Sequence, residues 1–257
     1  MERTVLITGA CKNSGYGIAE KFAQNGWQVV VTSRNAEEAK QTAERLSVKY
    51  QVNAYGLQTS AQDSEEEIEE KIAGLDRAGF CVDCIVLNAA NLGVGQEFFS
   101  LEISQFKEVF ETNVFWNFML VRCCAKPHER KEKRAIVFVT SNTAYRAIPD
   151  RAAYESSKGA ILALSRALAL DLGKYGIRSN CVLPGMIKTD RWVNNIGDIQ
   201  NAPSRYTPIG DIADFEDIAN AVYYFADDRS KNTTGAELVV DGGNMIQMYP
   251  IIPKENG

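Results

Sequence analysis

Short apolar segments alternate with longer amphipathic segments along the chain, and this order constrains the fold more than any other feature. The apolar segments lie at residues 4–8, 27–33, 53–58, 84–88, 135–141, 178–184 and 237–243. The amphipathic segments lie at residues 15–25, 35–49, 64–78, 102–126, 152–173 and 214–226. Strands that are apolar throughout are buried on both faces, so the alternation predicts a parallel sheet between two layers of helices.

A single α/β domain spanning residues 1–257 accounts for this pattern. The expected architecture is a doubly wound, Rossmann-like fold with a seven-stranded parallel sheet flanked by helices. A chain of 257 residues, 45% of them hydrophobic, is sufficient to fill one such core. The one long irregular stretch, residues 190–211, is expected to be a substrate lid, because long loops within compact domains are more often functional than idle.

The composition argues against several kinds of partner. The formal net charge of −5 does not favour binding to nucleic acid. No apolar run approaches the roughly 20 residues that a membrane span needs. The opening residues, MERT, lead directly into a strand and do not form a signal peptide. These features predict a cytoplasmic protein that acts on a small molecule.

Histidine and cysteine give little support to metal or hydrolase chemistry. The single histidine, His128, lies in the charged stretch KPHERKEKR, which is typical of a solvated loop. A Ser-His-Asp hydrolase would have to use this residue, and nothing near it resembles a nucleophile elbow. Cys81 and Cys84 lie in the apolar run FCVDCIVLN and are interpreted as core thiols. No metal site is expected.

The glycine-rich segment TGACKNSGYG lies between the first expected strand and the first expected helix. Gly9 permits a sharp exit from the strand. Gly15 and Gly17 allow the backbone to approach a phosphate and the helix to pack closely on the sheet. The helix N-terminus adds free N–H groups and a partial positive charge, so this segment predicts a dinucleotide site.

The end of the second strand predicts which dinucleotide binds. Enzymes that use NAD usually carry an acidic residue there, which holds the ribose 2′-hydroxyl. This chain has Ser33 and Arg34 instead, and a hydroxyl with a guanidinium favours a 2′-phosphate. Lys12, within the glycine-rich segment, can supply a second positive charge. The preferred cofactor is therefore expected to be NADP(H) rather than NAD(H).

Three residues suggest acid–base chemistry at the same edge of the sheet. Tyr154 and Lys158 are four residues apart in a helical pattern and therefore share a face. A nearby ammonium favours the phenolate and lowers the pKa of the phenol toward the working range. Ser141 ends an apolar strand, where a hydroxyl can hold the carbonyl oxygen of a substrate. This geometry is typical of hydride transfer.

Taken together, these motifs resemble the classical short-chain dehydrogenase/reductase family over nearly the full length of the chain. The resemblance rests on TGACKNSGYG, LNAA, TNV, the set Ser141, Tyr154 and Lys158, IRSNCVLPGMIKT and VVDGG. The chain departs from the family in two extra residues within the glycine loop, and in Leu87 and Ala90 around Asn88. The longer loop is similar to that of enoyl reductases in the same superfamily, but the close spacing of Tyr154 and Lys158 beside Ser141 favours reduction of C=O over C=C.

The resemblance implies roles for individual residues. Tyr154 is expected to be the general acid or base, with Lys158 lowering its pKa and binding the nicotinamide ribose. Ser141 is expected to hold the substrate oxygen, and Asn113 to anchor a water that relays protons from Lys158. The Ile187 backbone is expected to meet the nicotinamide amide. The residues expected to bind the cofactor are Gly9, Lys12, Gly15, Tyr16, Gly17, Ser33, Arg34, Asn88, Tyr154, Lys158, Pro184, Gly185, Ile187 and Thr189.

Two contacts remain open at this point. The adenine is expected to meet either Ser60 or Asp63. The substrate is expected to meet side chains in the lid and after the catalytic strand, which are mostly apolar or aromatic and favour an apolar substrate. These side chains are Tyr145, Ile148, Trp192, Tyr206 and Ile209.

The predicted function is an NADP(H)-dependent oxidoreductase that interconverts a ketone and a secondary alcohol. Within the same class, a hydroxysteroid dehydrogenase, a 3-oxoacyl reductase or a polyol dehydrogenase that uses NAD(H) is an alternative. A nucleotide-binding regulator without turnover is the alternative from another class. Such regulators usually lose the tyrosine or the lysine, and this chain retains both.

The chain is expected to form a homotetramer or a homodimer. The helical pattern at residues 102–126 is apolar around much of its circumference, more than one contact face requires. The pattern at residues 152–173 is similarly rich in alanine and leucine. The family resemblance implies that these two helices pair between subunits and that the VVDGG segment completes a tetramer.

Overall fold

The computed structural model describes residues 2–93, 95–126, 134–189 and 205–251. A seven-stranded sheet lies at its centre, with the strand order β3-β2-β1-β4-β5-β6-β7 and parallel pairing throughout. The strands are β1 (Thr4–Ile7), β2 (Gln28–Ser33), β3 (Ala54–Gln58), β4 (Val82–Leu87), β5 (Arg134–Val139), β6 (Ile177–Pro184) and β7 (Glu237–Val240). The predicted fold class is confirmed.

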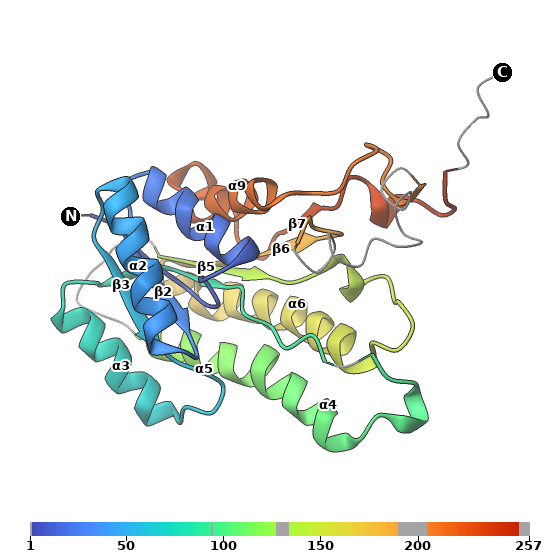
Figure 1. The fold of residues 1–257 in the computed structure, drawn as a ribbon, viewed down its shortest axis with the longest axis horizontal. Helices are drawn as coiled ribbons and strands as arrows, with labels where there is room; N and C mark the ends of the chain where they lie inside the picture. Colours follow the sequence, from blue (N-terminus) through green and yellow to red (C-terminus); the bar gives the residue numbers. More distant parts are fainter. Residues whose placement is uncertain (1, 94, 127–133, 190–204, 252–257) are drawn as a thin grey trace.

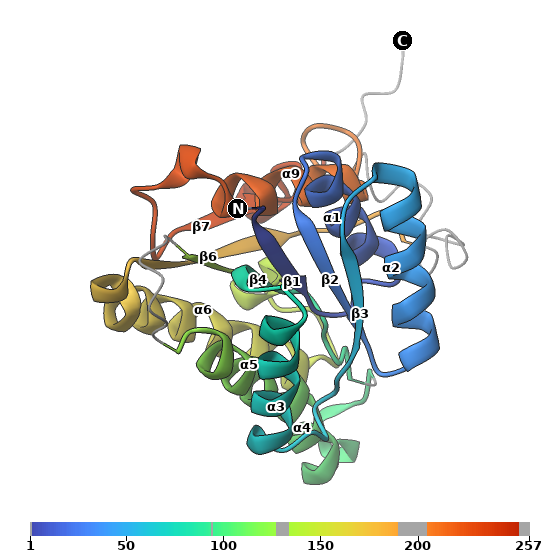
Figure 2. The same ribbon diagram turned by 90° about the vertical axis from the view of Figure 1, so that its left-hand side faces the viewer.

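Helices cover both faces of the sheet, as Figures 1 and 2 show from two sides. One face carries α1 (Asn13–Gln24), α2 (Ala36–Tyr50) and α9 (Phe215–Ala226). The other face carries α3 (Glu65–Arg77), α4 (Ile103–Phe110), α5 (Trp116–Cys124) and α6 (Ala152–Leu172). Short turns of helix complete the fold: η1 (Phe98–Ser100), η3 (Asn142–Ala144), η4 (Gly173–Tyr175), η6 (Asp228–Ser230) and η7 (Asn244–Ile246).

The alternation of side chains along each strand divides the core into two layers. On β1, Val5 and Ile7 pack beneath α1 and α9, whereas Leu6 between them packs toward α3 and α5. Phe22 of α1 anchors the first layer and Leu120 of α5 anchors the second, and both are almost completely buried. A strand covered on both faces needs apolar residues at every position, which explains the continuous apolar runs in the sequence.

The helix predicted at residues 102–126 is interrupted in the structure. The sequence predicted an unbroken helix over residues 102–126, but the structure has α4, then the wider π-helical turn η2 (Glu111–Phe115), then α5. A π-helical turn inserts an extra residue into the helical repeat and commonly occurs at functional sites. Asn113, one of the predicted catalytic residues, lies within this turn.

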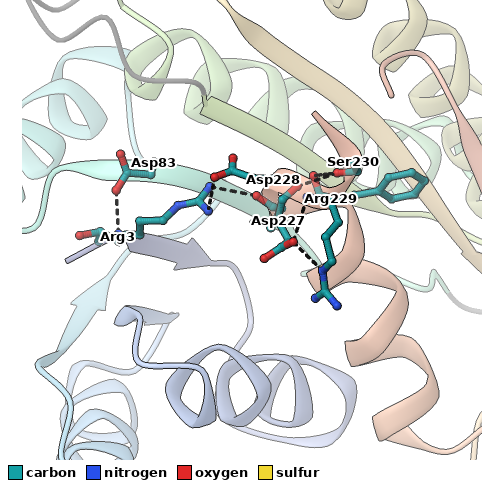
Figure 3. A network of polar contacts seen from close by, with 9 residues as sticks. Arg3, Asp83, Asp227, Asp228, Arg229 and Ser230 are labelled. Atoms are coloured by element: carbon teal, nitrogen blue, oxygen red, sulfur yellow. Dashed lines mark hydrogen bonds and ion pairs between the residues drawn. The ribbon is translucent and has the colours of Figure 1, made fainter. Parts of the chain in front are cut away.

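The amino-terminal edge of the sheet is closed by a network of polar contacts, drawn in Figure 3. The Arg3 guanidinium lies 4.1 Å from the centroid of the Trp27 ring and forms an ion pair with Asp228 at 3.8 Å. Asp83 accepts a hydrogen bond from Thr4 N at 2.8 Å. These contacts join β1, β4 and η6 at the edge opposite the carboxyl ends of the strands, so they stabilise the fold away from the predicted site.

A search of the described helices for a membrane-spanning segment finds none with the necessary length and apolar character.

Candidate active site

Ser141 lies just beyond the carboxyl end of β5 and caps the turn η3. Its side-chain oxygen accepts hydrogen bonds from Thr143 N at 3.2 Å and from Thr143 Oγ1 at 2.9 Å. Ser141 is mostly buried, with an exposed fraction of 8%. Because the hydroxyl oxygen already accepts two bonds, its proton is the part left to engage a neighbouring oxygen. This arrangement suits a group that holds a carbonyl oxygen.

Tyr154 and Lys158 lie one turn apart on α6 and face the end of β5. Lys158 Nζ lies 5.5 Å from the centroid of the Tyr154 ring. The same ammonium donates a hydrogen bond to Val139 O, the last residue of β5, at 3.1 Å. Lys158 therefore ties α6 to the strand that leads into Ser141, and the structure brings the three predicted residues together.

Burial dominates the acid–base properties of the tyrosine. The surrounding protein raises the pKa of the Tyr154 phenol, while hydrogen bonding with Ser141 acts in the opposite direction. The sequence predicted that Lys158 would lower this pKa, and in this structure the net shift is upward. The phenol is therefore protonated at neutral pH, which is the form that donates a proton.

Burial also shifts the pKa of the lysine. Loss of solvent lowers the pKa of the Lys158 ammonium to about 8, and the neighbouring Cys181 opposes this shift only slightly. An amine that is partly neutral near pH 8 exerts a weaker field than a fully charged one. Its hydrogen bond is made to Val139 O.

Asn113 forms its side-chain hydrogen bonds within the protein. Its Oδ1 accepts from Asn91 N at 2.7 Å, and its Nδ2 donates to Asn91 O and to Ser157 Oγ, each at 2.9 Å. Asn113 is 1% exposed. These bonds join the π-helical turn to the segment after β4 and to α6, so Asn113 holds three elements together. The water relay expected for this residue stays a prediction.

The glycine-rich loop is built around Asn88. Asn88 Nδ2 donates to Thr8 O at 3.1 Å and to Gly9 O at 3.3 Å, and Gly9 adopts a φ of +64°. A Cβ on Gly15 would lie 2.1 Å from Gly9 O and 2.7 Å from Asn88 Nδ2. Only glycine fits there. Asn88 thus shapes the loop, and its contact with a cofactor stays a prediction.

The third loop glycine serves helix packing. A Cβ on Gly17 would lie 2.8 Å from the Cβ of Phe215, the first residue of α9. Gly17 therefore allows α1 to approach α9 closely, whereas the loop pattern predicted close packing of the helix on the sheet.

The N-terminus of α1 fits an anionic group. Lys12 is exposed at the N-cap position, where no side chain caps the helix, and no acidic residue lies in the first turn. By contrast, Asn35, Ser64 and Asp214 cap α2, α3 and α9 with their side chains. The uncapped N–H groups and the positive end of the helix are suited to a phosphate. The residues present thus fit the pyrophosphate of a dinucleotide.

Tyr16, a predicted cofactor contact, is turned toward α2. The Arg45 guanidinium lies 4.8 Å from the centroid of its ring. Burial raises the pKa of the Tyr16 phenol, and the neighbouring Glu20 adds to this shift through its charge and a hydrogen bond. The backbone N–H of Tyr16 donates to Lys12 O at 3.2 Å within the helix. The phenol is therefore engaged by α1 and α2 in this structure.

The end of β2 carries a carboxylate that the sequence analysis missed. The Ser33 hydroxyl donates to Glu38 Oε2 at 2.6 Å and accepts from Asn35 N at 3.2 Å. Arg34 is exposed, and its backbone oxygen accepts from Gln58 Nε2 at 3.1 Å. The predicted 2′-phosphate pocket thus carries an anion, Glu38, beside the predicted cations Arg34 and Lys12. Glu38 follows Arg34 closely in the sequence, in the first turn of α2, so the sequence already showed that the two lie near each other.

The segment after β3 separates the two adenine candidates. Asp63 Oδ2 accepts from Thr59 Oγ1 at 2.7 Å and from Ser60 N at 3.1 Å, and it pairs with Lys71. Burial acts to raise the pKa of the Asp63 carboxyl, but these hydrogen bonds and the lysine charge outweigh it and hold the pKa below its usual range. Asp63 is thus occupied in closing this loop, which leaves Ser60 as the better candidate.

The segment after β6 runs across the top of the sheet. Pro184 ends β6, and Gly185 N donates to a carbonyl of β7 at 3.0 Å. Ile187 forms a parallel bridge with Ala213, and Thr189 N donates to Ile187 O at 2.8 Å. The structure therefore places these four predicted cofactor residues in one stretch at the carboxyl edge. Their contact with a cofactor stays a prediction.

Tyr145, a predicted substrate contact, is bonded to the edge strand β7. Its hydroxyl donates to Glu237 Oε2, and Glu237 is the first residue of β7. In this structure the Tyr145 hydroxyl is therefore engaged by the edge strand β7. A contact of Tyr145 with substrate stays a prediction.

The remaining substrate candidates are partly described. Ile148, Tyr206 and Ile209 are exposed, with Ile209 at 80%. Ile209 N donates to Gly242 O at 3.2 Å, which places this segment beside the end of β7. Trp192, most of the expected lid and His128 lie outside the described residues.

Ser157, between the predicted tyrosine and lysine, was also missed. It is fully buried, accepts the bond from Asn113, and donates from its hydroxyl to Tyr154 O at 2.6 Å. Ser157 is visible in the run YESSK, but the sequence does not show its partner. That partner, Asn113, lies in the π-helical turn η2.

One side-chain group among the described residues has the spacing of a metal site. Glu65, Glu69 and Cys123 place one ligand atom each within 4.8 Å of one another, between α3 and α5. Both carboxylates pair with cations, Glu65 with Arg122 at 3.0 Å and Glu69 with Lys126. The two carboxylates are thus neutralised by Arg122 and Lys126, and their closeness needs no metal ion to explain it.

Comparison with known proteins gives matches along nearly the full length. A family model described as Enoyl-(Acyl carrier protein) reductase matches residues 9–244. The L-rhamnose 1-dehydrogenase (NAD(P)(+)) of Azotobacter vinelandii is 27% identical, over 96% of this chain and 98% of that protein. The 3-oxoacyl-(acyl-carrier-protein) reductase FabG of Aquifex aeolicus is 26% identical, over 93% of this chain and 95% of that protein.

The solved structures agree with the sequence relatives. The structure of ElxO with NADP bound superimposes with a TM-score of 0.87 at 27% identity, covering 96% of this chain and 100% of that chain. Together with the parallel sheet and the glycine loop, these matches define an oxidoreductase that acts on alcohol or ketone substrates. Within that class, the chain belongs to the short-chain dehydrogenase/reductase family.

Proposed function

We propose that this chain is an NADP(H)-dependent oxidoreductase that interconverts a ketone and a secondary alcohol, with Tyr154 as its general acid and base. The observation that carries the proposal is the convergence of Ser141, Tyr154 and Lys158 at the end of β5. Lys158 reaches both Val139 O and the Tyr154 ring, and Ser141 acts to lower the pKa of the Tyr154 phenol.

Each side chain has a distinct task in this proposal. A bound nicotinamide cofactor supplies or accepts the hydride. In reduction, Tyr154 donates its phenolic proton to the carbonyl oxygen, and the Ser141 hydroxyl donates a hydrogen bond to the same oxygen. Because burial keeps the phenol protonated at neutral pH, the free site is poised for reduction. Lys158 can then return a proton toward the tyrosine.

Two cations support NADP(H) as the preferred cofactor. Arg34 and Lys12 are exposed at the end of β2 and at the start of α1, where they can meet a 2′-phosphate. Glu38 opposes this preference, because its carboxylate holds the Ser33 hydroxyl. The relatives use both cofactors by name: one is an NAD(P)(+) dehydrogenase, and another structure holds NADP.

A carbonyl substrate is favoured over an enoyl substrate. The family model carries the name of an enoyl reductase, but Ser141 is placed to hold a carbonyl oxygen beside Tyr154. The exposed side chains of Ile148, Tyr206 and Ile209 near this end of the sheet favour an apolar substrate. A panel of ketones, 3-oxo esters and sugars with NADPH tests whether the substrate is apolar.

Replacement of Tyr154 by phenylalanine is the central test. Tyr154→Phe removes the proton donor while retaining the ring, so we expect kcat to fall by roughly 10²- to 10⁴-fold. NADPH binding, measured by fluorescence titration, is expected to stay within a few-fold of wild type. A variant that still turns over at the wild-type rate would exclude the mechanism.

A protein that binds NADPH without turnover is the opposing outcome. If the wild type binds NADPH tightly but reduces no member of the panel, a nucleotide-binding regulator becomes the better description.

We also propose that the chain assembles as a homodimer or homotetramer. Exposed apolar side chains gather on the layer of α4, α5 and α6, where Ile103 is 68% exposed and Leu170 is 83% exposed. Covering these side chains by a second copy would remove them from water.

A further inference from the structure

A buried pair of polar side chains joins the catalytic turn to the end of β7. Asn142 follows Ser141 directly and is 7% exposed, and Asp241 follows β7 and is 5% exposed. Asn142 Nδ2 donates to Asp241 Oδ2 at 3.2 Å and to Asn244 Oδ1 at 2.9 Å. Both protons of the Asn142 amide are therefore used to hold the residue that adjoins the catalytic serine.

The Asp241 carboxylate is the centre of this group. Its Oδ2 also accepts from Met245 N at 2.7 Å, and its Oδ1 accepts from Gly243 N at 2.9 Å. A buried carboxylate with three N–H donors is held in one orientation, because moving it would leave polar groups unpaired. The Asp241 carboxylate is thus a fixed acceptor against which other segments can pack and bond.

The segment after β6 packs directly on this pair. A Cβ on Gly185 would lie 2.6 Å from the Cβ of Asp241 and 3.3 Å from Asn142 Nδ2. Gly185 lacks a side chain, so the turn proposed to meet the nicotinamide rests against Asp241 and Asn142. A shift of either side chain would move this turn.

The segment around Tyr206, which is expected to face the substrate, is bonded to Asn244 in the turn after β7. Asn244 Nδ2 donates to Tyr206 O at 2.8 Å. A Cβ on Gly243 would lie 3.0 Å from Pro208, so this segment packs closely on the turn after β7. Three segments that are distant in sequence therefore meet at the turn after β7: Asn142 and Gly185 contact Asp241, and the Tyr206 segment contacts Asn244 and Gly243.

We propose that Asn142 and Asp241 are positioning residues that set Ser141, the Gly185 turn and the Tyr206 segment at the correct mutual distances. The proposal rests on the proposed function, since it assigns these segments to catalysis, nicotinamide and substrate. Neither side chain touches the reacting atoms. Their effect is on the rate at which a correctly bound substrate reacts, because misplacing a reacting group by about 1 Å can cost 10²-fold in rate.

The test combines two isosteric single variants and their exchange. Asn142→Asp removes both amide donors and places a second carboxyl group against Asp241, and Asp241→Asn removes the carboxylate. The double variant N142D/D241N restores one donor facing an acceptor across this pair, but it leaves Met245 N without its acceptor and Asn244 Oδ1 without its donor. Asn180→Asp is the matched control, because Asn180 is also fully buried and its Nδ2 donates to Thr233 O at 2.9 Å, away from the catalytic turn.

Steady-state kinetics with NADPH and ethyl acetoacetate, cyclohexanone or fructose give the first readout. We expect each single variant to lose roughly 10- to 100-fold in kcat with NADPH affinity nearly unchanged. The double variant should recover part of the kcat that N142D loses. Asn180→Asp should lose stability but keep its kcat per folded molecule. Retention of kcat within threefold in both single variants would overturn the proposal, as would an equal loss in the control.

Amide hydrogen exchange gives a readout that needs no substrate. In N142D and D241N, we expect faster exchange together in residues 143–146 and 206–210, with the core strands unchanged. Faster exchange in only one of these two segments would show that they are not held by a common point. If wild-type protein binds no NADPH and reduces no probe, the proposed function fails, while the exchange experiment still tests whether Asn142 and Asp241 hold these segments.

Discussion

At the residue scale, burial governs the acid–base behaviour of the site more than pairing of charges does. The sequence suggested that a charged lysine would lower the pKa of the tyrosine. In the folded chain, burial raises the pKa of Tyr154 and lowers that of Lys158 to about 8. A spacing of four residues shows that two side chains share a helix face, but their distance from water depends on what packs against that face.

The lysine makes a prediction about stability. Its folded-state pKa of about 8 lies below the ordinary value of 10.5. Between these values the unfolded chain binds more protons, so the contribution of Lys158 to the free energy of unfolding rises with pH from about 8 to 10.5. Below pH 8 the buried ammonium costs on the order of 3 kcal/mol.

Lys158→Met should therefore be more stable than wild type at pH 7, by roughly 1–3 kcal/mol, although it should lose activity. The difference should shrink at pH 9.5. Urea unfolding without added cofactor at the two pH values measures it. Lys107→Met on α4 removes an exposed lysine and should show no such pH dependence. A destabilised variant with the same deficit at both pH values would contradict the inferred burial cost.

We expect cofactor preference to depend on two side chains of opposite charge, Arg34 after β2 and Glu38 in the first turn of α2. Arg34→Ala should lower NADPH affinity by roughly 10- to 100-fold, because a charge-assisted bond to phosphate is lost. NADH affinity should barely change. Glu38→Gln should raise NADPH affinity by roughly three- to tenfold, since it removes a negative charge beside the 2′-phosphate. Fluorescence titration of each variant with both cofactors measures the ratio.

A matched control is available on the same helix turn. Glu37→Gln removes an exposed carboxylate whose Oε1 accepts from Gln41 Nε2 at 2.8 Å, away from Ser33. It should leave the ratio of affinities unchanged. Equal binding of NADPH and NADH by wild type and by Arg34→Ala would show that the chain has no 2′-phosphate pocket at this position.

At the element scale, the strands and most helices follow directly from the residue pattern. The predicted segments at 178–184 and 152–173 correspond to β6 (Ile177–Pro184) and α6 (Ala152–Leu172). These elements are predictable because burial on both faces or on one face leaves a periodic signature in the sequence. The predicted strand 135–141 ends earlier, at Val139, because Ser141 accepts the hydrogen bonds of the following turn.

The π-helical turn could not be predicted in this way. Residues 102–126 have a continuous helical pattern, and the interruption at η2 accompanies the bonds of Asn113 to Asn91 and Ser157. These partners are 22 and 44 residues away in sequence. Periodicity reports which side of a helix is buried, but it carries no information on contacts between distant segments.

At the scale of the whole molecule, the two helix layers differ in the surface that they leave exposed. The layer of α4, α5 and α6 lies together in both ribbon views. It exposes Phe115 at 53%, Phe118 at 41% and Leu170 at 83%. Large exposed apolar patches on a soluble surface are typical of protein interfaces.

Leu170→Glu tests whether this layer forms an interface. We expect wild type to be a dimer or tetramer by light scattering, and the variant to shift toward a smaller assembly, because a carboxylate cannot be buried there without a partner. Val48→Glu on α2 replaces an apolar residue that is also 83% exposed and should change nothing. A wild-type monomer would exclude the proposed assembly, and an unchanged variant would place the interface elsewhere.

The sequence by itself determined the sheet, the glycine loop, and the set Ser141, Tyr154 and Lys158, because each depends on local periodicity or on a motif of adjacent residues. Tertiary structure alone decided the pKa values of Tyr154 and Lys158 and the attachment of Asn142 to Asp241. These properties depend on burial and on contacts between distant segments; Asn142 and Asp241, for example, are 99 residues apart. Only folding sets which such groups are removed from water together, and that removal sets the strength of their interaction.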